Sequence, residues 1–381
     1  MNQKEYIGLG SIRNIDAILD EVKPSAVFLV TGKESYATSG AQAVMRQYEK
    51  RCRFIRYSDI GSNPTDDDIR RGLEQYRKQP IDLVIAIGGG SVIDVAKSVN
   101  ILAVQPIDSG DIKAYITGKS KMVMGGKPLL AIPTTAGTGS EATHFSVVYM
   151  DGIKYSLAHP AILPQWAIID PELTYSLPAR IAAVSGADAL CQSIESLWSV
   201  RSTDESKDYA RKSLNVIKDN IAAAVKGDKK ARDAMSLAAH LSGKAINISK
   251  TTASHAMSYP LTMRFGIPHG QAVALTLSRI LVFNSQVSGA DGTDPRGSAY
   301  VNSAVKEILE IFGLKNPQDA VLYFSRLLND IGLASTFSEL SIYHTDADIE
   351  SVISEISAER AGNNPRRFTK EDARGILEDI R

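Results

Sequence analysis

The sequence has few cysteines, no excess of charge of either sign and no long run of apolar residues. Its two cysteines, Cys52 and Cys191, cannot form a disulfide framework, which indicates a reducing compartment. Basic and acidic residues number 43 each, so no general attraction to nucleic acid or anionic lipid is expected. No stretch approaches the roughly 20 apolar residues of a membrane helix, and the first residues lack the apolar run of a signal peptide. We therefore expect a cytoplasmic protein that binds neither nucleic acid nor membranes.

The composition is that of a folded globular protein large enough for more than one domain. Of its 381 residues, 44% are hydrophobic and 23% are charged, close to the average for soluble globular proteins. The sequence contains no internal repeat and no low-complexity tract. At roughly 150 residues per domain, its length predicts two or three domains.

The first part of the chain alternates strand-like and helix-like segments. Strands are predicted at 26–30, 53–57, 83–87 and 128–132, and helices at 40–50, 66–78 and 92–103. Thr65 is a plausible N-cap of the second of these helices. Such alternation implies right-handed crossovers and a parallel, doubly wound sheet. We predict an α/β domain over residues 1–168.

From about Pro171 strand-like runs become rare and alanine-rich helical segments dominate. These segments lie at 178–200, 206–225, 228–247, 270–284, 298–312 and 317–331. The tail from Asp346 also has helical character, with Thr369 as the expected N-cap of the last helix. We predict an all-α domain over residues 169–381.

Two glycine-rich loops follow predicted strands in the first domain. Gly88-Gly89-Gly90-Ser91 stands between a strand and a helix, where backbone N–H groups can face an anion. The loop Pro133 to Glu141 contains hydroxyls and glycines that suit a phosphate or a ribose. Either loop alone could be a purely structural turn, but two in one domain favour a dinucleotide.

The helical domain contains side chains that suit a divalent metal ion. Asp188 and Gln192 are four residues apart, which places them on one helix face. His255 precedes His269, which stands in a Pro-His-Gly sequence where a helix would begin. A carboxylate and two imidazoles suit Zn²⁺ or Fe²⁺ with an open position for substrate. Taken alone, the same residues could instead be packed or capping side chains.

In their order and spacing these motifs resemble the iron-containing alcohol dehydrogenases, the group III family that is structurally akin to dehydroquinate synthase. The resemblance rests on Gly88 to Lys97, Pro133 to Glu141, Asp188-Ala189-Leu190 and Pro268-His269-Gly270, and it extends over nearly the whole chain. It implies a dehydroquinate synthase-like fold and an NAD(P)-dependent oxidoreductase. Such an enzyme transfers a hydride between a nicotinamide and a small-molecule aldehyde or primary alcohol, and it commonly forms a homodimer or a larger homo-oligomer.

The resemblance also implies roles for individual residues. The cofactor pyrophosphate would be held by Gly88, Gly89, Gly90 and Ser91, the nicotinamide side would have Asp94 and Lys97, and the cofactor cleft would be lined by Thr134, Thr135, Thr138 and Ser140. The metal ligands would be Asp188, Gln192, His255 and His269.

The sequence departs from the family's pattern in three respects. Gln192 stands where the family usually has a histidine, and an amide oxygen is a weaker, neutral ligand, which leaves Fe²⁺ and Zn²⁺ open. Tyr259 replaces a histidine near the nicotinamide; as a catalytic residue it can still donate a proton, although its ordinary pKa of about 10 makes it a different relay. Gly32 and Lys33 replace an aspartate that binds the adenosine ribose in NAD-preferring members, which favours NADP(H) over NAD(H).

Several further segments resemble the subgroup of the family that reduces phosphonoacetaldehyde to 2-hydroxyethylphosphonate. These segments are residues 30–36, 152–156, 194–201 and 251–256. A phosphonate dianion needs cations and hydroxyls, and candidates near the loop or the ligand-bearing segments are Lys154, Tyr155, Arg201, Lys250 and Arg264. Any one of these could instead be a solvated or capping side chain.

Three alternatives to this substrate stay open at the level of sequence. The chain could be a dehydrogenase of a short-chain alcohol, glycerol or a sugar-acid alcohol. It could be a dehydroquinate-synthase-like lyase, which also uses a nicotinamide and a metal. Gln192 and Tyr259 are also compatible with a member that binds ligands without catalysis.

Overall fold

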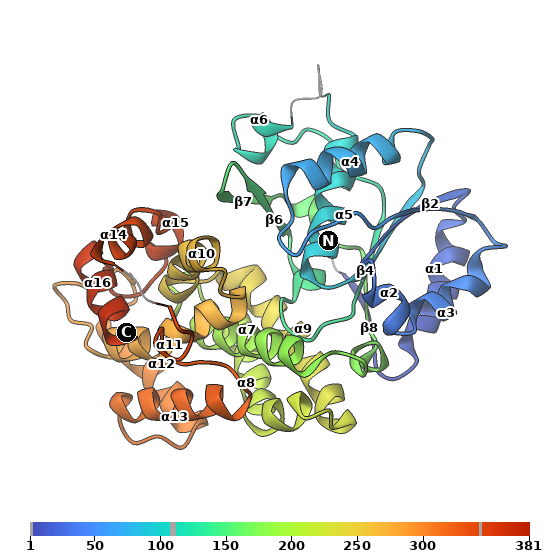
Figure 1. The fold of residues 1–381 in the computed structure, drawn as a ribbon. Helices are drawn as coiled ribbons and strands as arrows, with labels where there is room; N and C mark the ends of the chain where they lie inside the picture. Colours follow the sequence, from blue (N-terminus) through green and yellow to red (C-terminus); the bar gives the residue numbers. More distant parts are fainter. Residues whose placement is uncertain (1–2, 107–111, 343–344) are drawn as a thin grey trace. The chain divides into compact units, whose positions relative to one another are not determined.

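The computed structural model describes residues 3–106, 112–342 and 345–381. The chain divides into two compact units, Met1–Leu177 and Pro178–Arg381 (Figure 1), and each is described by itself. The predicted boundary between residues 168 and 169 falls inside the last strand of the first unit.

The first unit is built on a six-stranded parallel sheet. Its strands are β1 (Lys4–Ile7), β2 (Ala26–Thr31), β3 (Arg53–Tyr57), β4 (Leu83–Gly88), β5 (Leu129–Pro133) and β8 (Trp166–Ile169), in the spatial order β1-β8-β5-β4-β2-β3. The central strands β2, β4 and β5 are buried along their whole length, as expected for a sheet that is covered on both faces. The predicted doubly wound parallel sheet is thereby confirmed.

Helices cover both faces of this sheet because side chains alternate along each strand. They are α1 (Ile15–Val22), α2 (Ser35–Thr38), α3 (Ala41–Met45), α4 (Asp66–Tyr76), α5 (Gly90–Ala103) and α6 (Lys113–Ile116). Phe28 and Val84 share one hydrophobic core with residues of α4 and α5, whereas Leu29 and Ile85 share the other with residues of α1 and α3. Thr65 caps α4 through a capping box, as predicted, a contact worth about 1 kcal/mol.

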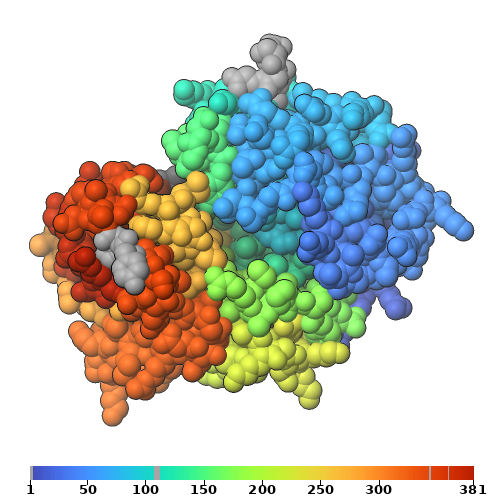
Figure 2. Space-filling model, in the orientation of Figure 1, coloured from blue at the N-terminus to red at the C-terminus, as the bar shows by residue number. Residues whose placement is uncertain are grey.

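An antiparallel hairpin stands outside the parallel sheet. It consists of β6 (Phe145–Met150) and β7 (Ile153–Ala158). Asp151 and Gly152 form its turn, and both have positive φ, as a tight two-residue hairpin turn requires. The side chains of β7 are mostly exposed or half-buried, and the hairpin is visible in green at the surface of the first unit (Figure 2).

The carboxyl ends of the central strands lie at one edge of the sheet. Thr31 of β2 pairs with Ile87 of β4, and Gly88 pairs with Pro133 of β5. The direction in which successive strands are added reverses between β2 and β4, and open α/β sheets bind ligands at such a switch point. The three segments predicted to bind the cofactor follow these strand ends, so the fold brings them to the same edge.

The second unit is helical, and its described residues contain no strand. Its helices are α7 (Ala179–Trp198), α8 (Asp204–Val225), α9 (Lys229–Ser249), α10 (Ala253–Phe265), α11 (His269–Ser285), α12 (Ser298–Ile311), α13 (Pro317–Asp330), α14 (Asp346–Ser354), α15 (Ala358–Ala361) and α16 (Lys370–Asp379). Thr369 caps α16, as predicted. Helix α10 has no predicted counterpart because it is buried on nearly every side and contains Pro260. Within the described ranges, no helix combines the length and the apolar character needed to cross a membrane.

Candidate functional site

The first candidate site lies at the carboxyl ends of β4 and β5. Helix α5 begins at Gly90 and no side chain caps its N-terminus, an arrangement that suits an anion. A Cβ on Gly88 would lie 2.6 Å from Val92 Cγ2, and one on Gly90 would lie 2.8 Å from Thr138. The Thr134 N–H donates to the Gly88 carbonyl at 3.0 Å. The two predicted loops therefore pack directly against each other, and glycine is what permits this.

Asp94 and Lys97 hold the second loop in place from α5. The Lys97 ammonium is buried and donates to the carbonyls of Ser140 and Thr143, the latter at 2.7 Å. Asp94 accepts a hydrogen bond from the Ser140 hydroxyl. Burial raises the pKa of Asp94 above its ordinary value, although Lys97 and Ser140 act against burial. These contacts give both residues a structural role in the loop, and their place beside a nicotinamide stays a prediction.

Gly32 and Lys33 follow β2 and have a second cation beside them. The Lys33 ammonium forms an exposed ion pair with Asp59 at 2.9 Å. Arg56 on the neighbouring strand β3 donates to the Thr31 hydroxyl at 2.8 Å and to the Gly32 carbonyl at 3.3 Å. Sequence reasoning did not identify Arg56, because its position beside Gly32 depends on the pairing of β2 with β3.

The second candidate site lies in the second unit and draws on α7, α10 and α11. Asp188, His255 and His269 place one potential ligand atom each within 4.8 Å of one another. His255 Nε2 lies 3.4 Å and His269 Nε2 lies 3.9 Å from the same oxygen, Asp188 Oδ1. The structure thus brings together Asp188, His255 and His269, and Gln192, the fourth residue predicted to bind a metal, is hydrogen-bonded to Asp188.

The chemistry of this donor set fits a divalent cation. Asp188 Oδ1 and His255 Nε2 are buried and have no hydrogen-bond partner among the described residues. An unsatisfied buried polar atom costs about 1–3 kcal/mol, and a bound cation would remove that cost for both atoms. One carboxylate and two imidazoles form a ligand set for Zn²⁺ or Fe²⁺.

A glycine allows α11 to begin against α7. A Cβ on Gly270 would lie 2.1 Å from the Val184 carbonyl oxygen and 3.0 Å from Asp188 Cβ. Any side chain at this position would push α11 away from α7, and His269 with it. The Pro-His-Gly motif therefore acts through packing, because it lets an imidazole start a helix beside the Asp188 carboxylate.

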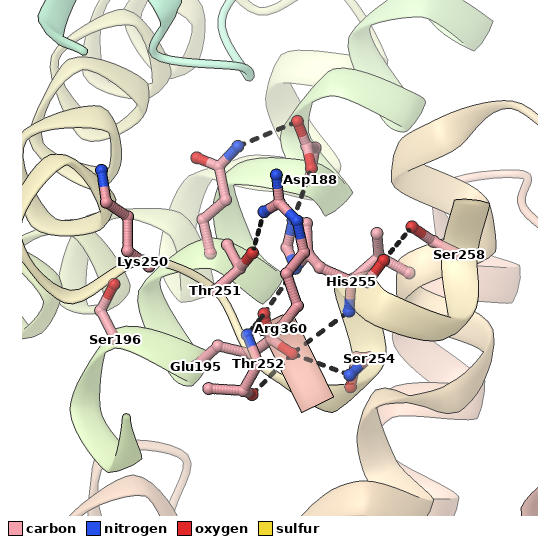
Figure 3. A network of polar contacts seen from close by, with 12 residues as sticks. Asp188, Glu195, Ser196, Lys250, Thr251, Thr252, Ser254, His255, Ser258 and Arg360 are labelled. Atoms are coloured by element: carbon pink, nitrogen blue, oxygen red, sulfur yellow. Dashed lines mark hydrogen bonds and ion pairs between the residues drawn. The ribbon is translucent and has the colours of Figure 1, made fainter. Parts of the chain in front are cut away.

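Glu195 anchors His255 from further along α7. Its buried carboxylate accepts hydrogen bonds from His255 Nδ1 at 2.5 Å and from the N–H groups of Thr252 and Ser254 at 3.0 and 2.9 Å (Figure 3). Burial would raise the pKa of Glu195, but His255 and Thr252 lower it below its ordinary value. Burial would lower the pKa of His255, but Glu195 and Asp188 raise it. The Nδ1 contact directs Nε2 of His255 towards Asp188.

Gln192 contacts this site through Asp188. Its Nε2 donates to Asp188 Oδ2 at 3.0 Å, and its Oε1 accepts from the Ser242 hydroxyl at 2.9 Å. Because an ionised carboxylate only accepts hydrogen bonds, the amide nitrogen must be the atom that faces it. The amide oxygen, which is the atom that could bind a metal, therefore faces Ser242. In this arrangement Gln192 orients Asp188, and its predicted role as a ligand would require the amide to turn.

Tyr259 contacts the candidate metal centre through the ring of His269. The two rings are stacked, with centroids 5.8 Å apart and planes 15° apart, and Tyr259 is 8% exposed. The guanidinium of Arg360, on α15, lies 5.0 Å from the Tyr259 centroid and donates to the Thr251 hydroxyl at 2.7 Å. Sequence reasoning missed Arg360, because no motif in the polar C-terminal segment marks it.

The residues predicted to bind a phosphonate belong to different elements of the two units. Lys154 and Tyr155 lie on β7 of the first unit, where the Lys154 ammonium lies over a neighbouring tyrosine ring. Arg201 follows α7 and is exposed. Arg264 pairs with Asp348 at 2.9 Å and thereby fastens α14 to α10. The carboxylate of Asp348 has a pKa lowered to about 2, mainly by hydrogen bonds at the N-terminus of α14 and then by Arg264.

Comparison with known proteins identifies the class to which these two sites belong. Residues 2–171 match the model of the iron-containing alcohol dehydrogenases, and residues 182–380 match that of the C-terminal part of the same family. The chain therefore belongs to the iron-containing alcohol dehydrogenase family and is an oxidoreductase, as the sequence motifs predicted.

Individual relatives have several substrates. The phosphonoacetaldehyde reductase of Streptomyces viridochromogenes is 35% identical over 328 residues, which cover 82% of this chain and 80% of that protein. The NADPH-dependent butanol dehydrogenase of Clostridium saccharobutylicum is 30% identical, covering 98% of this chain and 95% of its own. Among solved structures, sulfoacetaldehyde reductase from Bifidobacterium kashiwanohense in complex with NAD⁺ is 27% identical with a TM-score of 0.84, covering 99% and 96% of the two chains.

Proposed function

We propose that this chain is a metal-dependent, NADPH-preferring reductase that converts phosphonoacetaldehyde to 2-hydroxyethylphosphonate. The observation that carries the catalytic part is the convergence of Asp188, His255 and His269. Two potential metal-ligand atoms of this group, Asp188 Oδ1 and His255 Nε2, are buried and have no hydrogen-bond partner among the described residues. The substrate part is supported by the similarity to phosphonoacetaldehyde reductase over most of both chains.

The proposed metal centre uses Asp188, His255 and His269 as ligands of Fe²⁺ or Zn²⁺. When bound, the ion supplies Lewis-acid polarisation of an aldehyde carbonyl. Glu195 keeps the Nε2 lone pair of His255 available by holding the proton on Nδ1. Gln192 orients the Asp188 carboxylate through its amide N–H. These contacts fix the ligand atoms before an ion arrives.

Tyr259 is the residue to which we assign proton transfer. Its ring is held by stacking on His269 and by the Arg360 guanidinium. A bound reduced nicotinamide would supply the hydride for the carbonyl carbon. Tyr259 Oη then donates a proton to the carbonyl oxygen, which completes the primary alcohol.

The dinucleotide would be held by the first unit. Backbone N–H groups of Gly88 to Ser91 would face the pyrophosphate at the N-terminus of α5, and the loop from Thr134 to Ser140 packs against that turn. The preference for NADPH is supported by position 32, which is a glycine and carries no carboxylate, and by Arg56, whose guanidinium donates to the Gly32 carbonyl. The neighbouring cation Lys33 is paired with Asp59.

Initial rates of NADPH oxidation test this function. We expect kcat/KM to be at least tenfold higher for phosphonoacetaldehyde than for butyraldehyde, which corresponds to about 1.4 kcal/mol of extra binding in the transition state. Equal or faster turnover of butyraldehyde would instead identify a short-chain alcohol dehydrogenase, like the butanol dehydrogenase relative. Net oxidation of one NADPH per product would exclude the lyase alternative, which regenerates its cofactor.

A further inference from the structure

Among the described residues, the Arg360 guanidinium contacts neutral groups and has no carboxylate partner. Within the part of the chain that the structure describes, it donates one hydrogen bond, to the Thr251 hydroxyl, and lies over the Tyr259 ring, so most of its five N–H donors have no protein acceptor there. Arg264 of the same unit, in contrast, is paired with Asp348. Arg360 is half-buried, and a partly desolvated cation without a counter-ion is unfavourable. Its surroundings therefore suit an anionic ligand.

The backbone at Lys250, next to Thr251, has a strained conformation that contacts with Asn363 hold in place. Lys250 has φ 59° and ψ 178°, a conformation that costs a residue with a side chain of the order of 1–3 kcal/mol. Asn363 spans the kink, because its Nδ2 donates to the carbonyls of Ser249 at 2.9 Å and of Thr251 at 3.0 Å. Since Asn363 follows Arg360 closely in the chain, the same clamp holds the guanidinium and the Thr251 hydroxyl in register.

One aromatic ring separates this cation from the candidate metal centre. The Tyr259 ring contacts the Arg360 guanidinium and also stacks on His269. The residue after Thr251, Thr252, donates its N–H to the Glu195 carboxylate, which also accepts a hydrogen bond from His255. Figure 3 shows Arg360 reaching Thr251 within the polar network that includes His255. The Arg360 guanidinium is therefore linked to the candidate metal ligands through Tyr259 on one side and through Thr252 and Glu195 on the other.

We propose that Arg360 and Thr251 form an oxyanion subsite that binds the phosphonate group of the substrate while its carbonyl faces Asp188, His255 and His269. The inference rests on the proposed function and narrows its substrate class to short aldehydes whose other end is an oxyanion. The guanidinium fork binds two phosphonate oxygens. The Thr251 oxygen accepts from Arg360, so the hydroxyl hydrogen is available to a third.

The test compares the selectivity of three variants with that of the wild type. Arg360→Ala removes the cation, Arg360→Lys keeps the charge but loses the fork, and Arg326→Ala removes an exposed arginine of α13 as the matched control. The measured quantity is the ratio of kcat/KM for phosphonoacetaldehyde to that for butyraldehyde. We expect the ratio to fall about 10- to 100-fold in Arg360→Ala, by less in Arg360→Lys, and within about twofold of wild type in Arg326→Ala.

The equilibrium binding of 2-hydroxyethylphosphonate, measured by calorimetry, gives a second readout that does not depend on turnover. Its Kd should rise in Arg360→Ala by the same factor as the selectivity ratio falls. If the wild type prefers phosphonoacetaldehyde but Arg360→Ala keeps the ratio and the Kd, the subsite is wrong and the proposed function stands. An equal decrease in kcat/KM for both aldehydes would show that Arg360 has a structural role, and it would also overturn the subsite. A wild type without the preference overturns the proposed substrate itself.

Discussion

Replacing Glu195 by glutamine removes the negative charge that orients His255 while the shape of the side chain is kept. The carboxylate accepts hydrogen bonds from His255 Nδ1 and from two N–H groups at the first turn of α10. An amide offers one acceptor oxygen and one donor nitrogen, so at least one of these N–H groups would face another donor. Outer-shell partners of this kind typically change metal affinity by 10- to 100-fold, or about 1.4–2.7 kcal/mol.

The assay for Glu195→Gln is a Zn²⁺ titration of the metal-free protein against a competing chelator. The matched control is Glu310→Gln on α12, where an exposed carboxylate pairs only loosely with Lys306 at 3.6 Å and little effect is expected. We expect Kd for Zn²⁺ to rise 10- to 100-fold in Glu195→Gln and by less than about twofold in Glu310→Gln. Wild-type affinity in Glu195→Gln would refute the argument that Glu195 directs His255 towards the ion.

Gly270→Ala should lower the free energy of unfolding by more than about 2 kcal/mol, because its Cβ would lie 2.1 Å from the Val184 carbonyl oxygen. The control Gly289→Ala, which has open space around it, should change the free energy of unfolding by less than about 0.5 kcal/mol. Urea unfolding measures both variants, and equal stabilities would contradict the close approach of α11 to α7. Gln192→His should tighten Zn²⁺ binding about tenfold or more, because an imidazole replaces a neutral amide, and an unchanged Kd would show that this position does not reach the ion. Gly32→Asp should shift the ratio of kcat/KM for NADPH to that for NADH towards NADH, because a carboxylate repels the 2′-phosphate; an unchanged ratio would contradict the assignment of residue 32 to the adenosine end.

Local patterns predicted the parts of the fold whose periodicity is undisturbed. The buried strands β2 and β4 are continuous apolar runs, and Thr65 and Thr369 show the polar signature of a helix start. Helix α10 was not predicted, because Pro260 interrupts it and its buried faces leave no amphipathic pattern. The hairpin of β6 and β7 was not predicted either, since its pairing is set by the turn at Asp151 and Gly152.

The candidate metal centre was predicted from the sequence through the family resemblance, because its residue types alone also allowed packed or capping side chains. The resemblance implied that Asp188, His255 and His269 are ligands, and the structure brings these three side chains together. The role of Glu195 could have been predicted from its spacing, since it lies seven residues, or about two helical turns, after Asp188 on the same face of α7. Arg360 has no such signal in the sequence, because its position beside the centre depends on Asn363, whose contacts with the segment around Lys250 span a long stretch of chain.

The predicted phosphonate-binding cations show where proximity in sequence misleads. Arg264 is close in sequence to His255 and His269, yet its guanidinium is committed to Asp348 and Ser351 on α14. No local pattern reveals such a long-range ion pair. In contrast, Arg360 is distant in sequence from every candidate ligand and lies beside the ring that stacks on His269.

The central claim is that Asp188, His255 and His269 hold one divalent ion on which the reduction of phosphonoacetaldehyde depends. The most direct measurement titrates the metal-free protein with Fe²⁺ or Zn²⁺ while bound metal and NADPH oxidation are followed in the same samples. We expect activity to rise with bound metal and to level off at one ion per chain, and we expect Asp188→Asn to lose both signals. Full activity in the metal-free protein, or full metal binding and activity in Asp188→Asn, would contradict the account.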